Sequence, residues 1–260
     1  MKKDQINYFA DIVDSAAVAV TPITMLTAEA PEMTLEEAYD IQRASIARRL
    51  ERGEQLVGMK MGLTSKAKME QVGVHNPIYG HLTDTMVEGS GAELDRDLFI
   101  HPRVEPEVAF ILGKDLEGPT TPAEALDAVE SVCAALEVID SRFRDFKFTI
   151  IDVVADNASS SKIVLGTERV APDALDELGN LGMVMSHNGE VVKTGSSAAI
   201  YEHPANSLAE LANMLAERGE SLKAGQIVMA GGATAAIHVD SGDHVQVDVD
   251  ELGSVELSIG

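Results

Sequence analysis

The sequence predicts an α+β fold in which a helical N-terminal region, residues 1–55, precedes a β-rich region, residues 56–260. Over the first fifty residues, apolar side chains recur at intervals of three and four, which is the spacing of one helical face. From residue 56 onward, short apolar runs bounded by glycine and segments of alternating apolar and polar residues prevail, and both patterns are typical of strands. Helices therefore cluster at the front of the chain, which favours an α+β over a doubly wound fold.

The N-terminal region is predicted to contain two helices joined by a loop. Residues 6–16 place apolar side chains on one face of the first helix. Thr34 and Glu37 form a capping box that begins the second helix, and Gly53 follows its end, where a left-handed conformation is favoured. The segment between them, residues 21–32, contains two prolines and is expected to be a connection.

The β-rich region is predicted to combine mixed, largely antiparallel strands with a few helices. Strands are expected at residues 56–62, 104–112, 134–139, 183–192 (a hairpin with an Asn-Gly turn), 245–249 and 255–259. Helices are expected at residues 65–72, 121–132 and 206–218. The last two strands alternate apolar with polar residues, which predicts one buried and one exposed face.

The chain is strongly acidic, with 20 Lys+Arg against 43 Asp+Glu and a net charge of −23. Such a surface cannot neutralise phosphate groups, which argues against nucleic-acid partners and against anionic membranes. No apolar run reaches the roughly 18 to 20 residues of a spanning helix, and no signal-peptide core follows Met1. We therefore expect a cytoplasmic protein whose partner is a small molecule.

Cys133 is the single cysteine, which rules out an internal disulfide and a thiolate metal cluster. We expect it on the apolar face of a helix end, as a small packed side chain and not as a nucleophile. The histidines match no zinc motif, and neither a Ser-His-Asp set nor a phosphate-binding glycine loop is recognisable. Carboxylates and a lysine are therefore the stronger candidates for chemistry.

Glu105 and Glu107 are two residues apart on a predicted strand, so both carboxylates point to the same face. Taken alone, the pair is more typical of a solvated face of an edge strand. Pro106 supports an edge position, because proline cannot donate a ladder hydrogen bond.

Glu137 changes this interpretation, because it lies inside a run that otherwise predicts a fully buried strand. A buried carboxylate needs a cation, since leaving its charge uncompensated costs several kcal/mol or more. Three carboxylates from two neighbouring strands suit a hard divalent ion such as Mg²⁺ or Mn²⁺. The alternative is a structural ion pair of Glu137 with Arg103 or Arg142.

Lys60 lies between two methionines, with glycines at 58 and 62 on its own face. It is either a surface lysine that extends its ammonium into water or a lysine that faces a substrate, and the residues alone favour the surface. Residues 156–162 form a polar loop of small residues that is rich in hydrogen-bond donors, as many ordinary turns are.

Five segments carry a family resemblance: GMKMGLTS at 58–65, GVHNPIYG at 73–80, HPRVEPE at 101–107, LEVIDSR at 136–142 and VADNASS at 154–160. In this order they resemble the hydratase/decarboxylase family of the meta-cleavage pathway for aromatic compounds, within the fumarylacetoacetate hydrolase superfamily. The likeness runs over nearly the whole chain, including GGATA at 231–235. It implies that residues 56–260 form a catalytic domain with the β-roll of this superfamily.

The resemblance also implies roles for individual residues. The metal ligands would be Glu105, Glu107 and Glu137, and Lys60 would face the substrate. Asp156, Asn157 and Ser160 would lie near the site. Pro106 departs from the small residue expected between the two ligands, which puts the local strand pairing in question more than the ligands.

Within the family, KAKM at 66–69 and PIYG at 77–80 resemble the decarboxylase branch, which acts on 2-oxo-3-hexenedioate (4-oxalocrotonate). Hydratases of the family carry an acidic residue at the position of Ile78. An apolar wall suits the loss of CO₂, whereas a carboxylate suits the addition of water. The implied reaction yields 2-hydroxypenta-2,4-dienoate and CO₂, with a Lewis-acidic Mg²⁺ or Mn²⁺ as electron sink.

Several alternatives stay open from sequence. The sister hydratase of 2-hydroxypenta-2,4-dienoate and a non-catalytic module that binds divalent ions are both compatible with the residues, and hydrolysis of a carbon–carbon bond would need a His-Glu pair. Lys60 could act as a proton donor or as a fixed charge. The sequence is also compatible with a homo-oligomer or with a complex with the sister hydratase.

Overall fold

The computed structural model describes residues 1–64 and 77–260, so the helix predicted at 65–72 lies outside the described residues. The helices are α1 (Lys3–Val18), α2 (Leu26–Glu29), α3 (Leu35–Glu51), α5 (Pro122–Leu126), α6 (Ile150–Ala155) and α7 (Pro204–Ala216). The first seven strands are β1 (Leu56–Gly62), β2 (Ile78–Thr83), β3 (Val87–Gly89), β4 (Ala92–Leu94), β5 (Arg103–Leu112), β6 (Val129–Ile139) and β7 (Ser160–Leu165). The others are β8 (Gly182–His187), β9 (Glu190–Ser196), β10 (Ile227–Met229), β11 (Ile237–His238), β12 (His244–Val249) and β13 (Gly253–Ile259).

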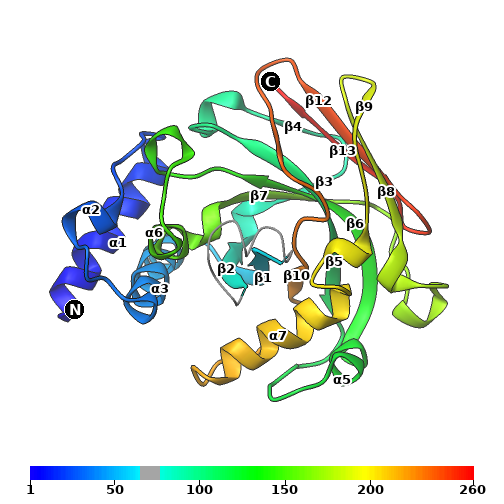
Figure 1. Cartoon of the computed structure of the whole chain (residues 1–260), viewed down its shortest axis with the longest axis horizontal. Coiled ribbons are helices and arrows are strands. Elements are labelled where there is room, and N and C mark those ends of the chain that lie inside the picture. Colours follow the sequence, from blue (N-terminus) through cyan, green and yellow to red (C-terminus); the bar gives the residue numbers. More distant parts are fainter. Residues whose placement is uncertain (65–76) are drawn as a thin grey trace.

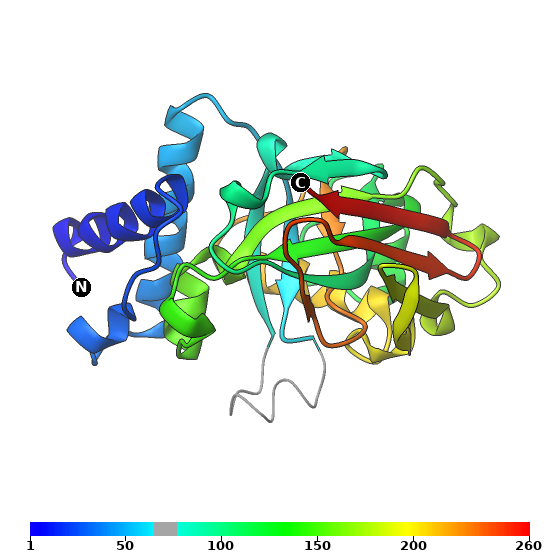
Figure 2. The same ribbon diagram turned by 90° about the horizontal axis from the view of Figure 1, so that it is seen from above.

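The predicted α+β arrangement is confirmed: helices α1 to α3 lie together at one side of a β-rich body (Figures 1 and 2). The capping box that begins α3 is formed as predicted, because the Thr34 hydroxyl accepts a hydrogen bond from the backbone N–H of Glu37. Gly53 follows α3 with a φ of 103°, a conformation that glycine adopts without strain. The expected connection at 21–32 includes one short helix, α2.

Two sheets make up the β-rich body. The larger has eight strands in the order β2-β1-β10-β5-β6-β7-β3, with β11 also paired to β5. The smaller has five strands in the order β4-β13-β12-β8-β9 and packs against β6 and β7. The predicted hairpin around Asn188 and Gly189 joins β8 to β9, and both turn residues have positive φ.

The larger sheet is curled, so its two ends face each other across a small interior. Leu82 and Met229, from the β2 and β10 side, pack in the same buried cluster as Cys133 and Ile163, from the β6 and β7 side. The outer face is covered by the smaller sheet and by helices, which share a second, larger core. The inner face therefore encloses little space, and a polar side chain placed there is shielded from water.

The helix predicted to begin after Thr121 is shorter than expected. Strand β6 begins at Val129, so this helix ends at Leu126 instead of reaching residue 132. The i, i+3 spacing of apolar residues there is compatible with either structure, and pairing with β5 over its full length selects the strand. Cys133 is accordingly on a buried strand and not on a helix end, and burial raises the pKa of its thiol to about 11. The predicted packed position of this side chain is thereby confirmed.

Strand β5 is central and not an edge strand, which corrects the position predicted from Pro106. Its neighbours are β6 on one side and β10 and β11 on the other. The carbonyl of Pro106 accepts a hydrogen bond from Ala233, in the segment between β10 and β11. Backbone N–H and C=O of one strand residue point the same way, so the proline nitrogen faces this gap, where no ladder donor is needed.

No helix within residues 1–64 or 77–260 is long and apolar enough to cross a membrane.

Candidate metal centre

Three glutamates converge on the inner face of the curled sheet. The register of β5 and β6 places Glu105 directly opposite Glu137, and Glu107 follows two residues along on the same face. One carboxylate oxygen from each residue lies within 4.8 Å of one from each of the others. Glu107 and Glu137 are fully buried, and Glu105 is 7% exposed. The structure thus brings together the three carboxylates that the sequence singled out.

This cluster is electrostatically unfavourable without a cation. Burial raises the pKa of Glu107 well above its usual range, and the nearby charges of Glu137 and Glu105 raise it further. Burial also raises the pKa of Glu137, against the opposing effect of Lys60. Among the described residues, Oε1 of Glu107 and both carboxylate oxygens of Glu137 have no hydrogen-bond partner, although an ammonium lies 3.1 Å from Oε2 of Glu137. Buried carboxylate oxygens without donors are the ligands that a hard divalent cation prefers, so the residues fit Mg²⁺ or Mn²⁺.

Lys60 lies beside this cluster, and the surface position favoured by its sequence context is wrong. It is on β1, only 2% exposed, with Nζ 3.1 Å from Oε2 of Glu137 and 3.2 Å from the carbonyl of Ala158. Glu137 therefore has its cationic neighbour in Lys60, and not in Arg103 or Arg142. An ammonium at this depth is retained because it faces carboxylates.

Glycines leave room around the ammonium. A Cβ on Gly62 would lie 3.5 Å from Nζ of Lys60 and 3.2 Å from Cγ1 of Ile78, whose side chain is 4% exposed. A Cβ on Gly80, which pairs with Lys60, would lie 2.5 Å from the carbonyl oxygen of Asn157. A larger residue at 62 would therefore crowd the ammonium, and a larger residue at 80 would collide with the backbone of Asn157. Ile78 presents an apolar surface at the same place.

Gly231 and Thr64 belong to the centre but were not predicted as site residues. The backbone N–H of Gly231 donates to Oε2 of Glu107 at 2.8 Å. Its φ of 113° and its contact with Thr64, whose Oγ1 would lie 2.1 Å from a Cβ, both require glycine. Thr64 is buried, and its hydroxyl has no hydrogen-bond partner in the described part of the chain. The Gly-Gly pair at 231–232 was the only signal in the sequence for this contact.

Asp156 and Asn157 are buried, and their side chains contact other parts of the fold. Asp156 forms an ion pair with Nε of Arg142 and accepts from its backbone N–H at 3.0 Å. Burial raises the pKa of Asp156 to about 6, although Arg142 opposes this shift. Asn157 accepts from the N–H of His81 at 2.7 Å and donates to its carbonyl at 2.9 Å, which attaches the loop to β2.

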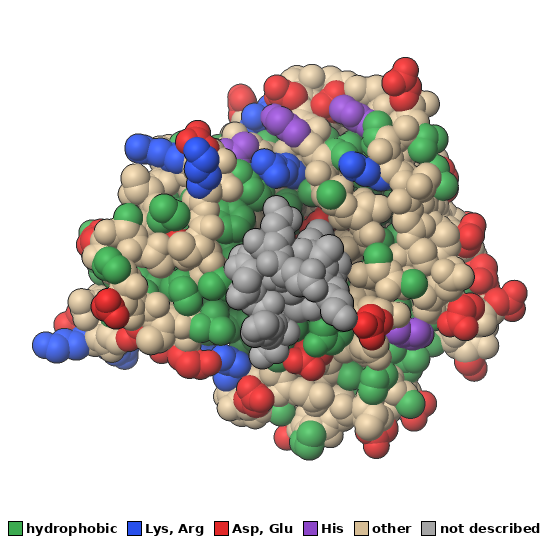
Figure 3. All heavy atoms as spheres, in the orientation of Figure 1, with side chains coloured by type: hydrophobic (Ala, Val, Ile, Leu, Met, Phe, Trp, Pro, Cys, Tyr) green, Lys and Arg blue, Asp and Glu red, His purple; other side chains and the backbone are tan. Residues whose placement is uncertain are grey.

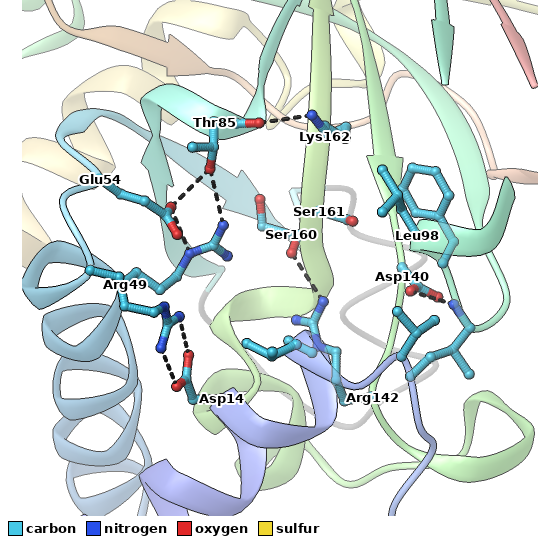
Figure 4. A pocket seen from close by; sticks show the side chains of 16 residues that line it. Asp14, Arg49, Glu54, Thr85, Leu98, Asp140, Arg142, Ser160, Ser161 and Lys162 are labelled. Atoms are coloured by element: carbon cyan, nitrogen blue, oxygen red, sulfur yellow. Dashed lines mark hydrogen bonds and ion pairs between the residues drawn. The ribbon is translucent and has the colours of Figure 1, made fainter. Parts of the chain in front are cut away.

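Ser160 lines a separate cavity of about 250 Å³ between the N-terminal helices and β7 (Figure 4). Its hydroxyl has no partner among the described residues, and its carbonyl accepts from Nη1 of Arg142 at 3.1 Å. The other cationic groups of this cavity are paired with carboxylates, as in the contact of Arg52 with Asp14 and the contact of Arg49 with Glu54, the second of which is labelled in Figure 4. The cavity therefore has no excess of free charge, unlike the acidic cluster.

A curled sheet that carries buried carboxylates on its inner face defines the class of fumarylacetoacetate hydrolase folds. The model of the fumarylacetoacetate (FAA) hydrolase C-terminal family matches residues 58–259, and the chain belongs to this family.

Three individual relatives within this family are similar to the chain over most of its length. The chain is 48% identical over 254 residues to the 4-oxalocrotonate decarboxylase of Pseudomonas sp, covering 98% of each. It is 43% identical over 221 residues to a 2-hydroxypent-2,4-dienoate hydratase of Pseudomonas putida, covering 84% of this chain and 99% of the hydratase. The solved 4-oxalocrotonate decarboxylase of Pseudomonas putida G7, complexed with magnesium and adipate, superposes with a TM-score of 0.98 at 42% identity. That match covers 100% of this chain and 99% of the solved one.

Proposed function

We propose that the chain decarboxylates 2-oxo-3-hexenedioate (4-oxalocrotonate) to 2-hydroxypenta-2,4-dienoate and CO₂ in meta-cleavage catabolism, with Mg²⁺ as cofactor. The observation that carries this proposal is the convergence of three buried carboxylates beside Lys60 and the apolar Ile78. Decarboxylases of this name are 44% to 48% identical to the chain over nearly its full length. The solved relative complexed with magnesium and adipate holds a divalent metal and a six-carbon dicarboxylate.

Glu105, Glu107 and Glu137 would hold the cation, with Mn²⁺ as an alternative to Mg²⁺. When bound, the cation supplies Lewis acidity toward the 2-keto oxygen of the substrate. The N–H of Gly231 fixes one oxygen of Glu107, which leaves the other directed into the cluster. Residues that already point at a common centre lose little conformational entropy on binding, so the site is pre-organised.

Lys60 would stabilise the negative charge that develops during the reaction and could donate a proton to the product. When the C5–C6 bond breaks and C6 leaves as CO₂, the electron pair of that bond moves through the C3–C4 double bond toward the 2-keto oxygen and leaves a dienolate. An ammonium that is 2% exposed and held by Glu137 stabilises this developing negative charge strongly, because water does not screen it. Protonation of the enolate oxygen then gives 2-hydroxypenta-2,4-dienoate.

Ile78 and the 156–160 segment would shape the space for the substrate. The apolar side chain of Ile78 offers no charge or hydrogen bond that would stabilise the departing carboxylate in the ground state. Asp156, Asn157 and Ser160 would act by holding this segment in place, so that the carbonyl of Ala158 reaches Lys60. Their predicted proximity to the substrate stays a prediction.

The direct test is to incubate the purified protein with Mg²⁺ and 2-oxo-3-hexenedioate and to measure CO₂ release, with an EDTA-treated sample as control. We expect release that depends on the cation and that stops in EDTA. A protein that hydrates 2-hydroxypenta-2,4-dienoate efficiently but leaves 2-oxo-3-hexenedioate unchanged would be the sister hydratase instead. Metal binding without turnover of either compound would support the non-catalytic module.

We also propose, from the chemistry of the product, that the enzyme forms a complex with the sister hydratase in the cytoplasm. The product 2-hydroxypenta-2,4-dienoate is the substrate that this hydratase consumes, so direct transfer would protect a reactive enol from water. Co-expression followed by size-exclusion chromatography would show a joint peak. Separate elution of the two proteins at micromolar concentration would contradict the complex.

A further inference from the structure

Arg103 begins β5 and lies two residues before Glu105 of the acidic cluster. Arg103 pairs with Ile139 in the register that pairs Glu105 with Glu137. Side chains two residues apart on a strand share a face, so Arg103 points to the same face as the glutamates. Two residues of strand correspond to about 6.7 Å, which is a distance that a six-carbon acid can span.

Arg103 has no carboxylate partner within the described part of the chain, although the protein has twice as many acidic as basic residues. The cationic groups of the neighbouring cavity, by contrast, are each paired. The described contact of the guanidinium is with the ring of Phe146, whose centroid lies 4.0 Å from Cζ. A ring against the face of a guanidinium leaves the N–H groups at its edge free to donate.

The ring of Phe146 is held firmly in this position. His101 and Phe148 pack against it with ring centroids at 5.3 Å and 5.5 Å. Asp145 and Phe146 both have left-handed backbone conformations, with φ of 58° and 56°. Such conformations are unfavourable for residues other than glycine and persist where the surroundings impose them. The segment is therefore built to fix the ring, and through it the orientation of the guanidinium.

The charge distribution on this face agrees with an anion site. Figure 3 shows Lys, Arg and His side chains along the upper part of the face, nearer its centre than most of the Asp and Glu side chains. His238 pairs with Arg103 across β11 and β5 and adds a second nitrogen-bearing side chain beside it. In a chain of net charge −23, such a region is where an anionic substrate can approach.

We propose that Arg103 binds the C1 carboxylate of the substrate, the one that the product keeps; this rests on the proposed function. A cation on the C6 carboxylate would stabilise the group that must leave, and so would slow the loss of CO₂. Strands β10 and β1 lie between β5 and β2 in the sheet, so Arg103 and Ile78 stand on different sides of the cluster. A substrate with C1 at Arg103 thus extends past Lys60 and places C6 toward Ile78.

Two ligands distinguish the carboxylates: 2-oxopentanoate, which has only the C1 carboxylate, and 2-oxohexanedioate, which adds a distal one. Calorimetric titration of the Mg²⁺-loaded protein measures both affinities without turnover. We expect Arg103→Gln to weaken both ligands by the same factor, about tenfold or more, because each loses one charged hydrogen-bonded contact. Arg103→Lys should weaken both by a smaller common factor, since it keeps the charge but loses the planar fork.

Arg144→Gln is the matched control, because it removes the same charge from an exposed residue whose Nε donates to the carbonyl of Pro22. It should leave both affinities unchanged. If Arg103→Gln binds only 2-oxohexanedioate more weakly, Arg103 contacts the distal carboxylate instead. If both affinities are unchanged, Arg103 contacts neither carboxylate. Either result overturns the proposal. If Arg103→Gln fails to fold, Arg103→Lys decides by the same comparison. A wild-type protein that binds both ligands but releases no CO₂ would refute the proposed function and not this contact.

Discussion

Two buried charged clusters both involve the segment that follows α6, and they are built in opposite ways. In the first, Arg142 donates to both carboxylate oxygens and to the carbonyl of Asp156, so that the pair is satisfied. In the second, three glutamates face one another with a single described ammonium, and three of their carboxylate oxygens have no described hydrogen bond. The difference shows that burial alone does not mark a functional charge.

The two clusters differ in whether their buried polar atoms have hydrogen-bond partners. A buried ion pair with all its hydrogen bonds formed contributes to a stable and specific structure, and nothing is left over for a ligand. A buried cluster with unpaired oxygens and repelling charges destabilises the metal-free fold. Binding of a cation to this cluster therefore stabilises the folded state. Substitutions in the two clusters should therefore have opposite consequences.

The largest effect is expected for Glu107→Gln. Losing one ligand should reduce the turnover of 2-oxo-3-hexenedioate by roughly 10³-fold or more, because Lewis-acid stabilisation contributes several kcal/mol. The free energy of unfolding without metal should stay equal or rise, since one of three repelling charges is gone. Steady-state kinetics and urea unfolding in EDTA measure the two quantities. Strong destabilisation of the metal-free protein would mean that Glu107 is held by contacts like those of Asp156.

Lys60→Met should lower kcat by about 10²- to 10³-fold at saturating Mg²⁺, since it removes a charge that stabilises the transition state. Methionine keeps most of the volume, so the fold should be retained. The kcat and the Mg²⁺-dependent rise in melting temperature are measured together. Near-normal kcat in a variant that still responds to Mg²⁺ would exclude a catalytic role for the ammonium.

Asp156→Asn should act on stability first. It leaves the buried guanidinium of Arg142 without its carboxylate, and breaking such a pair costs about 3 to 5 kcal/mol. The midpoint of urea unfolding should fall accordingly, while the Mg²⁺-dependent rise in melting temperature should persist. A variant with normal stability and no response to Mg²⁺ would show that the two clusters are not separate.

His81 predicts a pH effect outside both clusters. Burial lowers its pKa to about 4, and its Nδ1 lies 3.1 Å from Oε1 of Gln42. Unfolded histidine has a pKa near 6.5, so the unfolded state binds more protons and stability is lost as pH falls from 6.5 toward 4. The loss should reach about 3 kcal/mol. In His81→Gln this part of the pH dependence of unfolding should disappear, and in the half-exposed control His244→Gln it should remain. Equal slopes in all three proteins would contradict the account.

The smallest effect is expected for Ile78→Asp. A carboxylate next to the ammonium would raise the local polarity and repel the distal carboxylate of the substrate, so decarboxylation should slow by roughly tenfold. A circular-dichroism melt separates this effect from unfolding, because Ile78 is 4% exposed and an unpaired Asp there costs stability. Unchanged CO₂ release in the folded variant would remove Ile78 as a determinant of the reaction.

The acidic cluster was predictable because its signals are local. The two-residue spacing of Glu105 and Glu107 fixes a common face, and a charge inside the apolar run around Glu137 requires a cation. The depth of Lys60 was not predictable, because it depends on the curl of the sheet and on a glutamate 77 positions away in the chain. The central position of Pro106 likewise depends on the gap between β10 and β11, which local sequence does not encode.

The composition of the 156–160 loop did not predict which partners its side chains would contact. Asp156 and Asn157 appeared equally suited to contact a ligand, and the structure engages the first with Arg142 and the second with β2. These partners are 14 and 76 positions away, so only the tertiary fold determines how the side chains are used. The start of α3 and the β8–β9 hairpin, in contrast, followed from local capping and turn residues, as at Thr34 and Asn188.

The central claim is that the unsatisfied cluster binds a divalent cation and the satisfied one does not. Titration with Mn²⁺, followed by the loss of its free electron paramagnetic resonance signal, counts bound ions directly. We predict one ion per chain in the wild type and in Asp156→Asn, and none at micromolar Mn²⁺ in Glu107→Gln. Full Mn²⁺ binding by Glu107→Gln, or its loss in a folded Asp156→Asn protein, would contradict the account.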